Sequence, residues 1–285
     1  MSDEQYHLKD YQRVLFPYAY NILGSAEDAK DAIQDVLSNY VATHREGITN
    51  EKNYLIKSVV NQSINIRNRR KTVSSDDVWL PEPVATEAAD ANINLRDVAS
   101  YSLLILLEQL NPKERAVFIL KEAFGYSHEE IAEVLSSTVE NSRKLLSRAK
   151  ARLDPAQRPV STGKVTPDIL NNYINALTGG DTQQLESLLS KDISFFADGG
   201  TTHKVVKKTC QGLREVTDLL IYLYKTYQSA LSMEIKEINH QPAILLYNGP
   251  QLISCQVFRL DETDGRIAQI SVLVDPEKLK SLTIA

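Results

Sequence analysis

The stretch from residue 112 to residue 153 decides the fold of the middle of the chain, and it reads PKERAVFILKEAFGYSHEEIAEVLSSTVENSRKLLSRAKARL. Its apolar residues predict a helix over 113–124 that stops at Gly125, because glycine favours the left-handed turn that follows a helix. Ser127 and Glu130 have the spacing of a capping box, so a second, short helix is predicted to begin there.

A third helix is predicted after a tight, serine-rich turn. Ser137 and Glu140 repeat the capping-box spacing, and the helix should run from there to about Leu153. One side of it is an apolar stripe, made of Ser142, Leu146, Ala149 and Leu153. The opposite side is polar and basic, and it carries Asn141, Arg143, Lys144, Ser147 and Arg148. This arrangement is typical of a helix-turn-helix, whose last helix enters the major groove of DNA. A surface helical hairpin with solvated charges would share the pattern.

Composition limits the classes of protein to which the chain can belong. The 285 residues are enough for two or three domains, and 42% of them are hydrophobic, so substantial cores can form. The apolar runs fall short of the ~20 residues that span a membrane, and the polar start differs from a signal peptide. A cytoplasmic protein without a membrane partner is therefore expected. Cys210 and Cys255 lack the spacing of metal ligands, so neither a metal nor a cofactor is expected.

The distribution of charge points to a partner. The net charge is −5, which argues against tight binding of bare DNA by the chain alone, because neutralising phosphates supplies most non-specific affinity. The basic residues are nevertheless clustered at 67–71 and 143–152, whereas an acidic cluster lies at 27–35. This pattern suits a protein that is brought to DNA by a larger partner.

Three helices are predicted before the motif, over 8–23, 25–44 and 51–70, and Pro17 predicts a kink or a later start in the first. The polar side of the second helix carries Asp28, Asp31, Gln34 and Asp35. That side is either a solvated face or a docking face for a basic partner. The polar side of the third carries Lys57, Asn61, Gln62 and Asn65 and ends in Arg67, Arg69, Arg70 and Lys71. Amides and arginines can read bases and hold phosphates, although a basic helix end also complements the helix dipole.

Two linkers and a second kind of domain follow from the remaining pattern. Residues 72–95 lack helical periodicity and include WLPEP at 79–83, which is typical of an extended peptide that docks on another surface. A second linker covers 154–166. Beyond it, helices are predicted over 167–178, 182–190 and 213–227, and strands over 192–197, 205–210, 231–238, 243–247, 251–261 and 266–274. Helices followed by a run of antiparallel strands indicate an α+β domain.

Taken in order, these motifs resemble those of bacterial extracytoplasmic-function sigma factors, in the subgroup that carries a fused C-terminal SnoaL-like domain. The resemblance covers nearly the whole chain. Residues 19–34 are similar to sigma region 2, whereas 110–118 and the helix-turn-helix are similar to region 4. WLPEP matches the linker motif of the subgroup.

Two further motifs of the subgroup have counterparts near the C-terminus. Asp198-Gly199-Gly200 resembles the motif DGGGK, but Thr201, Thr202 and His203 intervene here before Lys204. The sequence DPEKL at 275–279 resembles NPxKL, with Asp in place of Asn.

The resemblance implies a multidomain fold. Two all-α sigma domains, a region 2 helical bundle and a region 4 helix-turn-helix, would precede an α+β cone of the SnoaL/NTF2-like type. The implied boundaries are 1–72 for region 2, 73–97 for the linker, 98–156 for region 4, and 167–285 for a SnoaL-like regulatory domain.

The resemblance also implies that the chain directs core RNA polymerase to promoters. Docking on the largest polymerase subunit falls to Asp28, Asp31, Gln34 and Asp35, and the second-largest subunit is a further expected contact. The −10 element falls to Lys57, Asn61, Asn65, Arg67, Arg69 and Arg70, and the −35 element falls to the outer face of the third helix of the motif. Regulatory contacts between domains are assigned to Trp79, Leu80, Pro81, Glu82, Pro83, Asp198, Gly199, Gly200, Asp275, Pro276, Lys278 and Leu279.

Two other classes remain open. One is a helix-turn-helix repressor with a ligand-sensing domain, but two separate DNA-reading regions and the acidic face argue against it. The other is a SnoaL-type cyclase or isomerase joined to a DNA-targeting module. Its candidate acids and bases, Asp198, His203 and Asp218, form no paired constellation, so we expect no catalysis. A small ligand or a protein effector of the C-terminal domain also remains open.

Overall fold

The computed structural model divides into two compact units, and the chain crosses between them more than once. The first unit contains residues 1–72 and 88–159, and the second contains residues 73–87 and 160–285. The residues that the structure describes are 3–42, 48–69, 79–87, 95–153, 167–200 and 209–283. Arg70, Lys71, His203 and Lys204, to which the sequence analysis gave a place, lie outside them.

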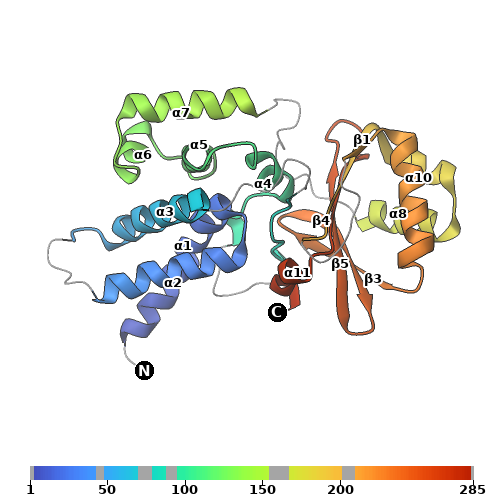
Figure 1. The fold of residues 1–285 in the computed structure, drawn as a ribbon, viewed down its shortest axis with the longest axis horizontal. Coiled ribbons are helices and arrows are strands. Elements are labelled where there is room, and N and C mark those ends of the chain that lie inside the picture. The colour runs from blue at the N-terminus through green and yellow to red at the C-terminus, as the bar shows by residue number, and fades with distance from the viewer. Residues whose placement is uncertain are drawn as a thin grey trace. The chain divides into compact units, whose positions relative to one another are not determined.

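The N-terminal part of the first unit consists of three helices, drawn in blue in Figure 1: α1 (Asp3–Leu23), α2 (Ala26–Ala42) and α3 (Glu51–Arg69). Helix α1 contains Pro17 in its interior, so the later start that this proline suggested is wrong. The apolar stripe of α2 is buried as expected, over Ala29, Ala32, Ile33, Val36, Leu37 and Tyr40. Each of the three helices packs against the other two.

The rest of the first unit contains η1 (Leu95–Asp97), α4 (Tyr101–Leu107), α5 (Pro112–Phe118), the π-helical turn η2 (Ile119–Ala123), α6 (His128–Val134) and α7 (Val139–Arg152). The capping box of Ser127 and Glu130 is confirmed at the start of α6. The second predicted capping box, that of Ser137 and Glu140, is wrong. Ser136 has a positive φ of 47°, the turn continues through Ser137, and Thr138 caps α7 by accepting a hydrogen bond from the Asn141 N–H.

The second unit is built on a mixed sheet. Its helices are α8 (Pro167–Gly179), α9 (Thr182–Leu188), α10 (Leu213–Leu223), the π-helical turn η4 (Tyr224–Gln228) and α11 (Pro276–Thr283). Its strands are β1 (Leu189–Asp198), β2 (Cys210–Gln211), β3 (Ser232–Ile238), β4 (Gln241–Asn248), β5 (Gln251–Leu260) and β6 (Ile267–Leu273). Among the described residues the strand order is β2-β1-β6-β5-β4-β3. The antiparallel run is confirmed from β3 to β6, whereas β1 lies parallel to β6.

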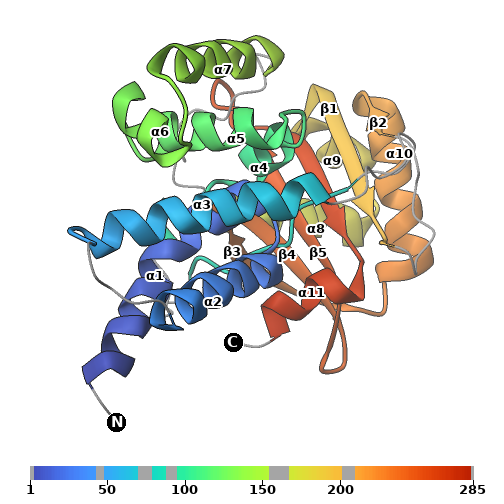
Figure 2. The same ribbon diagram turned by 60° about the vertical axis from the view of Figure 1, so that its left-hand side comes forward.

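The core of the second unit lies between the sheet and three of its helices. Helices α8, α9 and α10 cover one face of the sheet, and α11 lies on the other (Figures 1 and 2). The buried side chains on the covered face are aliphatic and aromatic, and Tyr173 meets Phe258 edge to face with 5.1 Å between ring centroids. In the described part of the chain, none of the helices has both the length and the apolar content to span a membrane.

Candidate nucleic-acid interface and linker site

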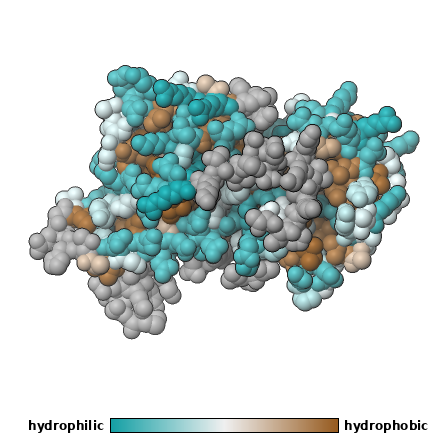
Figure 3. Space-filling view, in the orientation of Figure 1, coloured by the Kyte–Doolittle hydropathy of each residue, from teal (hydrophilic) through white to brown (hydrophobic). Residues whose placement is uncertain are grey.

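The outer face of α7 is available to solvent. Ser142, Leu146, Ala149 and Leu153 are buried, as the stripe predicted. Asn141, Arg143, Lys144, Ser147 and Arg148 are all exposed, and Figure 3 shows the top of the first unit, where α7 lies, as largely hydrophilic. The side chains of Arg143 and Lys144 are 64% and 62% exposed, and their carboxylate partners lie on the surface too. Such exposed ion pairs contribute little, so both cations can exchange them for phosphates.

A polar contact beneath α7 fixes its position on α6. The buried Ser142 hydroxyl lies 2.9 Å from Nδ1 of His128, the first residue of α6. The buried hydroxyl is therefore satisfied inside the motif, which explains a serine in an otherwise apolar stripe.

The acidic face of α2 is also open. Asp31, Gln34 and Asp35 are exposed, and Asp28 is half-buried. Asp35 accepts a hydrogen bond of 3.3 Å from the Gln62 amide on α3, and this contact leaves the carboxylate accessible.

The polar face of α3 is divided between solvent and other helices. Asn65 and Arg69 are exposed, and Lys57 is half-buried. The Asn61 amide donates to the carbonyl oxygen of Val134, the last residue of α6, at 2.8 Å. The −10 residues expected from the sequence are thus only partly exposed, because the helix-turn-helix meets α3 directly.

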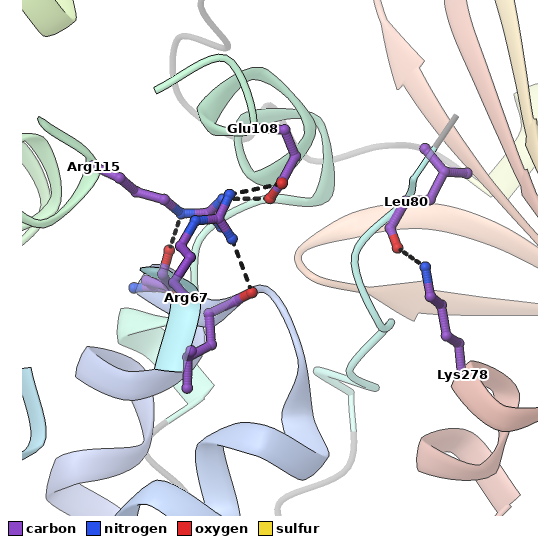
Figure 4. Close-up of polar contacts among 7 residues, drawn as sticks. Arg67, Leu80, Glu108, Arg115 and Lys278 are labelled. Carbon is purple, nitrogen blue, oxygen red and sulfur yellow. Dashed lines mark hydrogen bonds and ion pairs between the residues drawn. The ribbon is translucent and has the colours of Figure 1, made fainter. Parts of the chain in front are cut away.

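One carboxylate joins two arginines from different parts of the first unit. Glu108, just after α4, accepts from Arg67 of α3 at 2.7 Å and from Arg115 of α5 (Figure 4). The Arg115 side chain is 0% exposed, and its Nε donates to the carbonyl oxygen of Asn21 at 2.8 Å. Arg67 also donates to the Leu23 carbonyl oxygen at 3.1 Å. The resemblance assigned Arg67 to the −10 element, and the structure gives it a carboxylate partner inside the protein.

Burial opposes the charge of Glu108 and acts to raise its pKa. The Arg115 and Arg67 guanidiniums outweigh that effect and hold the pKa of Glu108 below its usual value. Glu108 is therefore an anion near neutral pH, and it balances two cations of which one is fully buried.

Further contacts bind the end of α1 to the segments around the helix-turn-helix. The Asn21 side chain donates to the Asp97 carbonyl oxygen and accepts from the Ala99 N–H, both at 2.8 Å. The Tyr18 ring stacks on Phe124 with 4.0 Å between centroids. The N-terminal helices and the helix-turn-helix therefore form one packed body.

The WLPEP segment lies in the second unit. The sequence predicts a linker over 73–97; of its described residues, 79–87 belong to the second unit and 95–97 to the first. The Leu80 N–H donates to the Asp198 carboxylate at 2.7 Å, and Lys278 of α11 donates to the Leu80 carbonyl oxygen at 2.7 Å (Figure 4). Lys278 and Asp198 also form an ion pair at 2.7 Å, with side chains only 11% and 5% exposed.

The Lys278 ammonium also lies over an aromatic ring, 4.2 Å from the ring centroid of Trp79. Burial lowers the pKa of Lys278, and the Asp198 carboxylate opposes that shift. The backbone and the indole ring of the segment are therefore held by one buried ion pair. Of the other segment residues, Pro81 and Pro83 are buried and Glu82 is half-buried.

The end of the same segment extends the sheet. Ala85 bridges to Ile238 of β3 in antiparallel fashion, the Thr86 N–H donates to the Glu237 carbonyl oxygen, and the Asn239 N–H donates to that of Val84. This is strand addition at a sheet edge, in which main-chain hydrogen bonds provide most of the recognition. The segment is thus bound at two places on the second unit.

The two C-terminal motifs supply the side chains that contact Leu80 and Trp79. The Gly200 N–H donates to Asp198, and a Cβ at Gly200 would lie 2.3 Å from Oδ2 of Asp275. Gly200 also has a φ of +59°, so glycine is required there for two reasons. Asp275 accepts from the Glu277 N–H at the start of α11. Gly199 and Leu279, which belong to the same two motifs, are also buried. Pro276 is the first residue of α11.

Known protein sequences match the chain over both units. A family model described as sigma-70, region 4 matches residues 102–153, which include α5 to α7 and all of α4 except Tyr101. The extracytoplasmic-function (ECF) RNA polymerase sigma factor SigJ of Mycobacterium tuberculosis is 24% identical over 284 residues, and the match covers 93% of this chain and 89% of SigJ. Probable ECF RNA polymerase sigma factor SigI of the same species is 24% identical, with 95% and 93% covered. The chain is a homologue of these extracytoplasmic-function sigma factors over nearly its whole length.

The crystal structure of the M. tuberculosis sigma factor SigJ shares the fold of this sigma factor over its length. The TM-score is 0.76 at 21% identity, and 97% of this chain and 98% of that one are covered. The fold class expected from the sequence is therefore confirmed, with helical sigma regions followed by an α+β unit as in the SigJ structure.

The two candidate catalytic residues that the structure describes lie in other settings. Asp198 is paired with Lys278, and Asp218 is exposed on α10. His203 lies outside the described residues. Within the described ranges, His, Cys, Asp and Glu residues form no group of three that could hold a metal ion. The curated relatives named above are sigma factors.

Replacing Lys278 with Met should lower the free energy of unfolding of the second unit by about 3 kcal/mol, because the buried Asp198 carboxylate loses its counter-charge. Urea denaturation of the full chain measures this change. Trp79 is the only Trp of the chain, so its fluorescence reports release of the segment directly. The control is Lys280→Met, since Lys280 lies on the same helix and its pair with Glu277 is exposed. Equal loss of stability in both variants would contradict a structural role for the buried pair.

Proposed function

We propose that this sigma factor directs core RNA polymerase to its promoters through separate surfaces of the first unit. The exposed basic face of α7 would read the −35 element, through Arg143, Lys144 and Arg148 with Asn141 and Ser147. The exposed acidic face of α2 would dock on the largest polymerase subunit. The polar face of α3 would read the −10 element once it is accessible. The observation that carries the proposal is the solvent-exposed face of α7 over a fully buried stripe, in the family-matched motif.

We further propose that the second unit regulates initiation rather than catalysing a reaction. This proposal is supported by the position of residues 79–87, which belong to the second unit although they lie in sequence between the two sigma regions. Because the Asp198–Lys278 pair and the edge of β3 hold this segment, the state of the second unit controls how freely the two regions can separate. A small ligand or a protein effector would change the activity by binding the held and released states unequally.

The test is run-off transcription with purified core polymerase and a cognate promoter. Addition of the full-length protein should produce a promoter-specific transcript that core polymerase alone does not make. A chain that ends at Val274 lacks α11 and Lys278, so it should release Trp79 and Leu80 and raise the transcript yield at equal soluble concentration. A transcript that is independent of the protein would contradict the sigma-factor proposal. Equal yields from the full-length and shortened chains would contradict only the regulatory one.

A further inference from the structure

The outer side of α10 and η4 (orange in Figure 1) carries an exposed pair of tyrosines. Tyr222 and Tyr227 are 56% and 63% exposed, and their ring centroids lie 6.3 Å apart with 84° between the ring planes. Residues five apart on an ordinary α-helix point about 140° away from each other. The π-helical turn, in which the Ser229 N–H donates to the Tyr224 carbonyl oxygen five residues back, brings the two rings together. Such turns are frequent at functional sites, and exposed large apolar side chains that lie side by side are typical of interaction surfaces.

Two carboxylates continue this side of α10 toward the start of the helix. Asp218 lies four residues before Tyr222 and Glu215 lies seven before it, so the three side chains share one face. Both carboxylates are exposed, and neither has an ion-pair partner among the residues that the structure describes. A hydrogen bond with Tyr222 raises the pKa of Tyr227, so this hydroxyl stays protonated near neutral pH. The α10 face, made of Glu215, Asp218, Tyr222 and Tyr227, therefore combines anions with uncharged aromatic rings and is the complement of Lys and Arg side chains.

The chain itself contains a helix face with the matching chemistry. On α7, Lys144 and Arg148 are exposed and lie four residues apart, which is about 6 Å along the helix axis. Asp218 and Tyr222 have the same separation on α10. The Lys144 ammonium pairs with Glu140 only at the surface, and Arg148 has no ion-pair partner within the described part of the chain. An ammonium suits a carboxylate, whereas a guanidinium is weakly hydrated and stacks on an aromatic ring.

We propose that the α10 face of one copy of this protein binds the basic face of α7 in a second copy. Asp218 pairs with Lys144 of the second copy, and the ring of Tyr222 receives its Arg148. The two surfaces differ, so the contact is heterologous and leaves one α10 face and one α7 face open at the ends of any assembly. An α7 face that is covered in this way cannot enter the major groove, so association withholds the −35 reader from DNA when the protein is abundant. This consequence rests on the proposed function, whereas the association itself does not.

Analytical ultracentrifugation of the full chain, over roughly 1–200 µM, tests the association in the range expected of a small interface. The mean mass should rise with concentration above the 32.0 kDa of one chain. Asp218→Asn/Tyr222→Ala should raise the concentration at which half of the chains are associated by roughly tenfold or more, because one ion pair and one cation–π contact are lost. The control, Glu262→Gln/Tyr54→Ala, makes the same kinds of change at exposed positions elsewhere and should associate like the unaltered chain.

Two complementary variants test whether the contact joins different copies. Lys144→Ala/Arg148→Ala removes the α7 side, whereas Asp218→Asn/Tyr222→Ala removes the α10 side. Each variant alone should remain mostly single. An equimolar mixture should form a species of twice the mass, because one variant supplies an intact α10 face and the other an intact α7 face. The mixture should stop at two copies, whereas the unaltered chain continues to longer assemblies, since a heterologous contact need not close.

Three outcomes would overturn the inference. The first is an unaltered chain that keeps the mass of one copy at every concentration. The second is association of Asp218→Asn/Tyr222→Ala that is as strong as that of the control. The third is a mixture that lacks the paired species, which would mean that the two faces do not bind each other across copies. Sedimentation needs neither polymerase nor DNA, so failure of the sigma-factor proposal would be seen separately as absence of a promoter-specific transcript.

Discussion

Reversing the charges of Asp31 and Asp35 to lysine should abolish binding of this sigma factor to core RNA polymerase. Both carboxylates are exposed on α2, off its buried stripe, so the substitutions should leave the helix folded. Close charge pairs across interfaces contribute about 1.5–7 kcal/mol each, and reversal replaces attraction with repulsion. Pull-down of core polymerase measures the loss, and circular dichroism checks the fold.

A control with the same change in net charge separates docking from bulk electrostatics. Glu215 and Asp218 are exposed on α10 of the second unit, and reversing both should leave binding of core polymerase intact. Normal binding by the α2 variant, with an unchanged circular dichroism spectrum, would remove the docking face from the proposal. Equal loss in both variants would point to net charge instead.

Replacing Arg143, Lys144 and Arg148 with Ala should lower promoter affinity by a factor on the order of 100 or more. Each base contact is worth ~1–3 kcal/mol, so three losses exceed about 3 kcal/mol even at the lower bound. The fold should survive, because all three side chains are exposed. Binding of a −35 duplex by holoenzyme over a range of salt concentrations distinguishes the roles. Each lost phosphate contact lowers the salt slope by about 1, whereas each lost base contact relaxes the preference at one position.

The matched control removes two arginines and one lysine from the second unit. Arg214, Lys225 and Arg266 are exposed there, and their replacement by Ala should leave promoter binding unchanged. Initiation by the α7 variant at the normal level, from the same promoter, would show that α7 is not the −35 reader.

The helix-turn-helix could be predicted from sequence because its signals are local. The capping box of α6 and the apolar stripe of α7 span a few residues each, and both are where the sequence placed them. The cap of α7 was misplaced by one residue, since Ser137 and Thr138 are both good N-caps and the positive φ of Ser136 decides between them.

The contacts that give the polar residues their partners could not be predicted, because they are not local. Arg67 and Glu108 lie 41 residues apart, and Asp198 and Lys278 lie 80 apart. Periodicity places Arg67 on a polar face but cannot say whether water, DNA or a carboxylate meets it. The parallel pairing of β1 with β6 was missed for the same reason, since helices and the four strands β2 to β5 intervene in the sequence. A buried arginine such as Arg115 also has no sequence signal of its own.

The division of the chain between its units has a consequence for how the protein is made. Leu80 and its partner Lys278 are 198 residues apart, so at roughly 5–20 residues per second the ribosome delivers Lys278 about 10–40 s after Leu80. In the later part of that interval, once α7 has been made, both DNA-reading regions are complete, whereas the segment that the second unit holds still lacks Lys278. Under the proposed regulation, a nascent chain passes through an unrestrained stage. A product that is truncated by early termination or by proteolysis before α11 would remain in that stage permanently.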